Sequence, residues 1–153
     1  MLTECVREDL RNAVLCWLAT VDSTGLPNVS PKEIFAAHGD GALLIADIAS
    51  PISVRNIGFN PRVCVSFVDV FRQRGYKITG TARLIAPDEP EFEAVGHPIL
   101  LLAGADFRVR HIIYVEIERV GRILAPSYLL FPDRSIEEHV RRAHETYKVA
   151  PRK

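Results

Sequence analysis

Several polar residues in the middle of the chain have the types and the spacing of a phosphate site. Serine is a preferred N-cap residue and proline a preferred first helical residue, so Ser50-Pro51 predicts a short helix over Ile52 to Phe59. The first N–H groups of a helix have no partner within it, and the helix dipole favours an anion there. Ser53 adds a hydroxyl group and Arg55 adds a positive charge close to this helix start.

Lys32 joins this group if two distant segments of the chain meet. It lies in a polar interruption, SPKE at residues 30–33, between the apolar Val29 and the apolar run Ile34 to Ala37. We expect a polar ligand at this break because the flanking residues are typical of a buried strand. If the strand and the helix start are neighbours in space, Lys32 supplies a second positive charge to the phosphate. The alternative is an ordinary helix cap and a solvated lysine.

The motifs of several other chemistries are missing from the sequence. The metal-ligand patterns C-x-x-C, H-E-x-x-H and H-x-H do not occur and the five histidines are scattered, so we predict no metal site. The nucleophile pattern G-x-S-x-G and the Gly-rich phosphate loops are also absent. We interpret the three cysteines, Cys5, Cys16 and Cys64, as buried, reduced thiols. These patterns leave the catalytic residues unassigned.

Composition limits the class of protein and of partner. The 153 residues fit one domain, and the 19 basic and 19 acidic side chains cancel. A nucleic-acid or membrane-surface role usually leaves a basic excess, so we expect neither partner. No apolar run reaches the roughly 20 residues that span a bilayer, and the first residues do not resemble a signal peptide. The sequence therefore favours a cytoplasmic protein.

Periodicity predicts strands with a few helices around them. An amphipathic helix is indicated by Leu2, Val6, Leu10 and Val14, and a second helical segment spans residues 91–103 with an interruption at Gly96 and Pro98. The terminal helix, at about 135–148, begins with the capping-box pattern S-x-x-E. The predicted strands are 14–21, 28–37, 42–47, 62–68, 76–85 and 112–117, with 123–127 as an extension. This order predicts a mainly β protein with flanking helices, built on a small antiparallel barrel.

Three segments of the chain together resemble one known family, the pyridoxamine 5'-phosphate oxidase-like flavin-binding split barrels. They are LATVDSTGLPNVSP (Leu18 to Pro31), LLIADIASP (Leu43 to Pro51) and VRNIGFNPRVCVSF (Val54 to Phe67), in this order and with these spacings. The resemblance covers most of the chain. It implies a six-stranded antiparallel split β-barrel over residues 1–153, and a homodimer that holds two FMN molecules in clefts between its subunits.

The resemblance also implies where FMN binds. In such proteins the second strand lies along the flavin, and the turn into the short helix takes the phosphate. Carried over by position, the flavin contacts are Asn28, Val29, Ser30, Pro31 and Lys32, with Ala46 and Asp47 nearby. The implied phosphate contacts are Ser50, Ser53 and Arg55.

The activity implied by the resemblance is that of an FMN-dependent oxidoreductase acting on an unidentified small molecule. The vitamin B6 oxidases carry a C-terminal tryptophan and an R-x-H-D-R-like motif, whereas the only tryptophan here is Trp17, which argues against pyridoxamine phosphate as the substrate. One alternative is a flavin-binding or electron-transfer protein without turnover, and another is a relative that uses a deazaflavin or haem. Substrate contacts could come from Arg72, Arg74, Lys77, Tyr128 and residues 99–107.

Overall fold

A computed structural model describes residues 1–150, and over this range the backbone forms one antiparallel sheet of seven strands with five helices. The predicted mainly β fold with flanking helices is confirmed, with seven strands instead of six. The strands are β1 (Cys16–Val21), β2 (Pro27–Lys32), β3 (Phe35–His38), β4 (Ala42–Asp47), β5 (Arg62–Asp69), β6 (Arg74–Ile85) and β7 (His111–Leu124). The helices are α1 (Glu4–Asn12), α2 (Pro51–Phe59), α3 (Glu91–Ala103), α4 (Ser127–Leu130) and α5 (Ile136–Tyr147).

The strand order rolls the sheet into a split barrel. The order is β2-β1-β5-β6-β7-β4-β3, so the two edge strands are β2 and β3, which are consecutive in the chain. Only Glu33 and Ile34 lie between them, and the three steps from Lys32 to Phe35 span at most about 11 Å. The end of one edge must therefore lie beside the start of the other. The single strand predicted over residues 28–37 is wrong, because the polar break is the point where the chain leaves one edge for the other.

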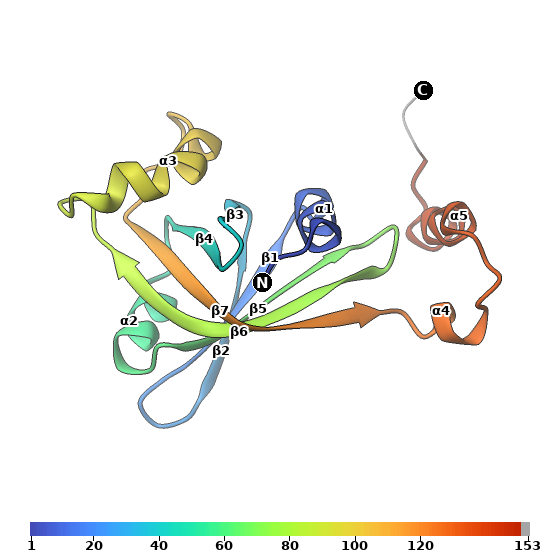
Figure 1. The fold of residues 1–153 in the computed structure, drawn as a ribbon, viewed down its shortest axis with the longest axis horizontal. Helices are drawn as coiled ribbons and strands as arrows, with labels where there is room; N and C mark the ends of the chain where they lie inside the picture. Colours follow the sequence, from blue (N-terminus) through green and yellow to red (C-terminus); the bar gives the residue numbers. More distant parts are fainter. Residues whose placement is uncertain (151–153) are drawn as a thin grey trace.

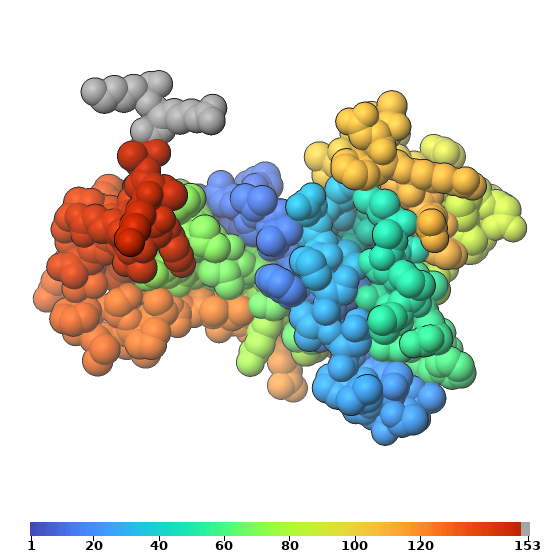
Figure 2. All heavy atoms as spheres, turned by 180° about the vertical axis from the view of Figure 1, so that it is seen from behind, coloured from blue at the N-terminus to red at the C-terminus, as the bar shows by residue number. Residues whose placement is uncertain are grey.

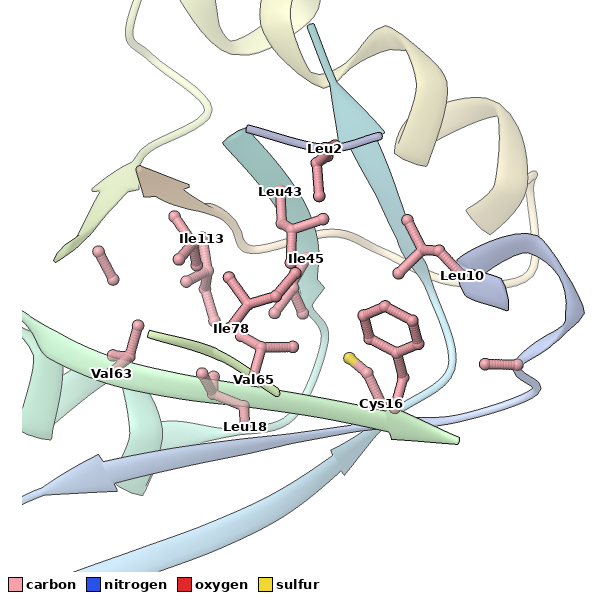
Figure 3. Close-up of a cluster of buried hydrophobic side chains, with 14 of the residues drawn as sticks. Leu2, Leu10, Cys16, Leu18, Leu43, Ile45, Val63, Val65, Ile78 and Ile113 are labelled. Atoms are coloured by element: carbon pink, nitrogen blue, oxygen red, sulfur yellow. The ribbon is translucent and has the colours of Figure 1, made fainter. Parts of the chain in front are cut away.

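The barrel interior holds the main core (Figure 3). Side chains from α1 and from β1, β4, β5, β6 and β7 meet there, and Cys16, Leu18, Ile45, Ile78 and Ile113 are fully buried. A second cluster forms where α3 packs on the outer face of β4, through residues such as Phe92, Ile99 and Leu44. Strand β4 is thus buried on both faces, which explains why its sequence, ALLIAD, is almost entirely apolar.

The helix α1 closes one end of the barrel. Leu2, Val6 and Leu10 are buried as the periodicity predicts, but the helix ends at Asn12, and Val14 is 78% exposed, so its assignment to the apolar stripe is wrong. Asp9, on the same helix, accepts hydrogen bonds from the guanidinium of Arg74 at 2.9 and 3.1 Å. This buried ion pair fixes α1 to β6.

Residues 74–79 of β6 pair with residues 119–124 of β7 and form an arm that leads to α4 and α5, at the opposite end of the molecule from α3 (Figures 1 and 2). Strand β7 is continuous from His111 to Leu124, so it joins the predicted strand 112–117 to the start of the predicted extension 123–127. Helix α3 continues through Gly96 and Pro98, so the predicted interruption is wrong, and α4 was not predicted. Ser135 caps α5 by accepting a hydrogen bond from the N–H of Glu138 at 3.2 Å. Among residues 1–150, no helix is long and apolar enough to cross a bilayer.

Candidate functional site

Lys32 connects the end of β2 to the start of α2. Its side chain is only 5% exposed, and Nζ donates to Oγ of Ser30 at 2.6 Å and to Oγ of Ser50. The structure thus brings together the two segments whose proximity the sequence left open, and Lys32 is not a solvated lysine. Two neutral hydroxyl groups hold this ammonium in place without neutralising it.

The charge of Lys32 is only partly balanced by its surroundings. Burial lowers the pKa of the Lys32 ammonium, and the nearby Asp47 carboxylate and Cys16 thiol act in the opposite direction. Neither group forms an ion pair with Lys32 within 4 Å in the described part of the chain. A partly buried cation that lacks a close counter-ion is suited to bind an anion.

Asp47 positions the helix start and does not face the cleft described below. Its Oδ1 accepts a hydrogen bond from the N–H of Ser50 at 2.9 Å, and its Oδ2 lies 3.0 Å from Nδ1 of His111. The carboxylate is almost fully buried by these two partners. Asp47 therefore holds residues 48–50 in the conformation that presents Ser50 to Lys32.

The first turn of α2 leaves polar groups free. Ser50 is the N-cap residue as predicted, but its side chain makes no cap hydrogen bond, and its hydroxyl accepts from Lys32 instead. Within residues 1–150, no hydrogen-bond acceptor is found for the N–H groups of Ile52 and Ser53, whereas Val54 donates to the carbonyl of Ser50 at 3.1 Å. The buried Oγ of Ser53 also lacks a partner there. This helix start retains its capacity to bind an anion.

These elements border an open cleft of about 520 Å³. Its lining combines the polar group around Lys32 with apolar and aromatic side chains. The lining residues are Leu15, Trp17, Ser30, Pro31, Lys32, Glu33, Ile34, Ala46, Ile48, Ala49, Ser50 and Phe107. The volume and the mixed lining are typical of a site for a cofactor or another small molecule, with aromatic surfaces for a ring and a cation for an anionic group.

The cleft contains half of the residues that the resemblance implies. Ser30, Pro31, Lys32, Ala46 and Ser50 line it. The other five, Asn28, Val29, Asp47, Ser53 and Arg55, are not among its lining residues.

Four of these five residues have other surroundings, and those of Asp47 are described above. Asn28 donates to Oγ1 of Thr20 at 3.4 Å, whereas Val29 is exposed on the outer face of β2. Ser53 is buried, and Arg55 is exposed on α2 without an ion pair to any residue of the range 1–150. Whether they contact a cofactor therefore stays a prediction.

Sequence reasoning missed most of the aromatic and loop residues of the cleft. Trp17 and Phe107 come from β1 and from the link between α3 and β7, about ninety positions apart in the chain. Phe107 falls within the range 99–107 proposed for substrate contacts. The other candidates for substrate contacts, Arg72, Arg74, Lys77 and Tyr128, lie in or next to the arm formed by β6 and β7. The hydroxyl group of Tyr128 donates to the carbonyl of Arg72 at 2.6 Å. These four arm residues do not line the cleft of their own chain.

The thiols and histidines of the described residues offer no competing centre. Cys16 is buried and Cys64 half-buried as expected, but Cys5 is exposed, so its assignment to the core is wrong. Burial raises the pKa of the Cys16 thiol to about 12. Within residues 1–150, no three His, Cys, Asp or Glu side chains are grouped so that they could hold a metal ion.

The rolled sheet with its open cleft beside Lys32 defines a split-barrel protein, and a comparison of the sequence with family models identifies the family. The model described as pyridoxamine 5'-phosphate oxidase matches residues 2–123, and the chain therefore belongs to this family. The suspected resemblance is confirmed. No curated protein matches the chain.

Solved structures with the same fold include proteins from several bacteria. HupZ of Group A Streptococcus is 25% identical over 82% of this chain and 96% of its own, with a TM-score of 0.71. A candidate pyridoxamine 5'-phosphate oxidase of Lactobacillus delbrueckii is 25% identical over 78% of this chain and 93% of its own, with a TM-score of 0.66. An FMN-binding protein of Syntrophomonas wolfei shares the fold at 13% identity, over 78% and 84% of the two chains, with a TM-score of 0.65.

Proposed function

We propose that the cleft binds FMN and that the protein is a flavin-dependent oxidoreductase acting on a small molecule. The observation that carries the proposal is the buried ammonium of Lys32, held between Ser30 and Ser50 beside the unpartnered N–H groups of α2. Family membership and a structural neighbour named as an FMN-binding protein support it. FMN, when bound, supplies hydride and electron transfer, and the chain binds and orients it.

The residues of the cleft fit the two parts of FMN. The phosphate would be held by the N–H groups of Ile52 and Ser53, with Arg55 free on the same helix to reach it. The flavin ring would lie along the end of β2, against Pro31 and between the aromatic surfaces of Trp17 and Phe107. Lys32 would lie between these two parts, where its charge would stabilise the phosphate or negative charge on the flavin ring.

A second copy of the chain would complete this site. On the outer face of β1 and β2, Trp17 is paired with Pro31 and Ala19 with Val29, and Trp17 and Val29 are 47% and 57% exposed. An apolar outer face on an edge strand is a surface that proteins usually cover. We therefore propose a homodimer with FMN at the subunit interface. Analytical ultracentrifugation tests it, and a monomer that still binds FMN tightly would show that the shared site is wrong.

Titration with FMN tests the cofactor assignment directly. We expect the chain to bind one FMN, and the quenching of flavin fluorescence monitors this binding. In a Lys32→Met/Arg55→Gln variant the affinity for FMN should be at least tenfold lower, because charge-assisted bonds to the phosphate are lost. Lys77→Met/Arg122→Gln removes the same two charges from the exposed arm and should leave the affinity unchanged. An absorption spectrum of the protein as isolated that shows haem or a deazaflavin would overturn the assignment.

Turnover is tested separately from binding. We expect NADH or NADPH to reduce the bound flavin under anaerobic conditions, and an added acceptor to reoxidise it. Of the residues that line the cleft, only Lys32 and Glu33 have ionisable side chains, so we expect the cofactor and not a side-chain acid–base pair to carry the chemistry. A flavin that binds but is not reduced by either nucleotide would favour a protein that only binds or carries flavin.

A further inference from the structure

A second hollow lies directly beside the cleft. It has a volume of about 560 Å³ and is formed by the loop after β4, by Pro87 and by residues 106–110, which link α3 to β7. Ile48, Ala49 and Phe107 line both the cleft and the hollow. A small molecule bound in the hollow would therefore lie next to a ligand bound in the cleft, and Phe107 would contact both molecules.

Two arginines face this second hollow. Arg108 and Arg110 both line it, while Val109 between them is buried in the second core cluster. The backbone N–H of Arg110 donates to the carbonyl of Asp47 at 2.8 Å, which anchors this segment to the end of β4. The core contact of Val109 and the hydrogen bond of Arg110 hold the two guanidinium groups on the same side of the segment.

Neither arginine is paired with a carboxylate in the described structure. Most other arginines of residues 1–150 form ion pairs: Arg7, Arg11, Arg62, Arg72, Arg74, Arg83, Arg141 and Arg142. The single carboxylate that lines the hollow is Asp106, which is exposed and has no ion pair to a residue of this range. The hollow thus has a net positive charge beside an apolar and aromatic wall.

We propose that this hollow binds the substrate and that Arg108 and Arg110 hold a carboxylate or phosphate group on it. Guanidinium groups form paired, charge-assisted hydrogen bonds with both of these anions. The uncharged part of the substrate would lie against Phe107, at the border with the cleft. The substrate class is therefore a small organic anion with an apolar or aromatic body. This assignment rests on the proposed function, because it takes the neighbouring cleft as the FMN site.

Calorimetric titration of the FMN-loaded protein tests the substrate assignment with three probes of similar shape. Benzoate carries a carboxylate, phenyl phosphate carries a phosphate, and benzamide is neutral. We expect one or both anions to bind at least tenfold more tightly than benzamide, and the tighter of the two indicates which acid group the site prefers. Equal binding of all three probes would overturn the proposal.

Substitutions then assign the binding to the two arginines. Arg108→Gln/Arg110→Gln should weaken anion binding at least tenfold and leave FMN affinity unchanged, and Arg108→Lys/Arg110→Lys should restore part of the loss. The control Arg119→Gln/Arg122→Gln removes two exposed, unpaired arginines from β7 and should have no effect. Equal losses of anion and FMN affinity would overturn the proposal, because the arginines would then hold the cofactor.

The same titrations on protein without FMN separate the two proposals. If the chain does not bind FMN but benzoate or phenyl phosphate still binds in an arginine-dependent manner, the anion site stands and the proposed flavin function fails. If FMN binds but neither anion depends on Arg108 and Arg110, the cofactor assignment stands and the substrate site is wrong.

Discussion

Lys32 and Ser50 are eighteen positions apart in the chain, and Nζ of Lys32 donates a hydrogen bond to Oγ of Ser50. This contact joins the last residue of an edge strand to the residue that precedes α2. It keeps an ammonium group at the bottom of the cleft although burial disfavours its charge. The stability of the protein should therefore depend on the protonation of Lys32.

Replacing Lys32 with Met should remove a pH dependence of folding. Because burial lowers the pKa of Lys32 in the folded state, the unfolded chain binds its proton more tightly. Folding stability contributed by this group therefore rises with pH from the lowered pKa to the ordinary lysine value of about 10.4. Urea unfolding at about pH 8 and about pH 10 should show a smaller rise for Lys32→Met than for the wild type. The exposed Lys77→Met should keep the wild-type slope.

Thiol labelling should distinguish Cys5 from Cys16. Cys5 is exposed, whereas Cys16 is buried in the core with a pKa raised to about 12 by that burial. The thiolate is the reactive form, so we expect iodoacetamide to alkylate Cys5 in the folded protein and Cys16 only after unfolding. Peptide mass spectrometry reads both sites. Alkylation of Cys16 in the native protein at a rate similar to Cys5 would contradict the buried position of β1.

Leu18→Ala tests the barrel core. Leu18 is fully buried between α1 and the strands, so its truncation should lower the free energy of unfolding by about 2–5 kcal/mol through lost burial and a residual cavity. Leu26→Ala in the turn of the same hairpin changes a side chain that is 66% exposed, and should stay within about 0.5 kcal/mol of the wild type. Denaturant unfolding monitored by circular dichroism measures both variants.

Gly80→Ala tests the bulge in the pairing of β6 with β7. The pairing with β7 shifts between Thr79 and Gly80, and a Cβ atom on Gly80 would lie 2.0 Å from the carbonyl oxygen of Glu116. Since this neighbour is backbone, we expect a loss of at least about 2 kcal/mol. Gly58→Ala is the control, because a Cβ there meets nothing within 4 Å and alanine favours the helix by roughly 0.5–1 kcal/mol. Thermal unfolding should move in opposite directions for the two variants.

Elements that combine an apolar pattern with clear end signals were predictable from the sequence. Helix α2 begins at Pro51 and ends before Asn60-Pro61, and β4 coincides with the apolar run 42–47. Residues 118–122 of β7 were missed because both faces of the strand are largely exposed there, which leaves no alternation to read. Helix α3 passes through Gly96 because the lack of a side chain lets it approach Ile112, where a Cβ would lie 2.2 Å from Cδ1.

The candidate site was predictable only in part for a similar reason. Lys32 and Ser50 were identifiable because a charge in a strand and a serine before a proline are local signals. Trp17 was not, and Phe107 was included only within the broad range 99–107, since their contribution depends on how distant segments meet around the cleft. Asp47 was placed near the flavin by position, and the structure shows its carboxylate bound to the N–H of Ser50 and 3.0 Å from Nδ1 of His111. It shapes the loop after β4, and its contact with a cofactor stays a prediction.

The short connection through Glu33 and Ile34 makes the width of the cleft a property of chain length. The two edge strands are joined by only two residues, so they cannot separate unless β2 or β3 loses its pairing with the neighbouring strand. Lys32 directly precedes this connection, so a bound molecule that displaces its ammonium would also shift the two edge strands relative to each other. An insertion at this point would widen the gap between the two edge strands and lower the affinity for any bound ligand, although every side chain that contacts the ligand would be unchanged.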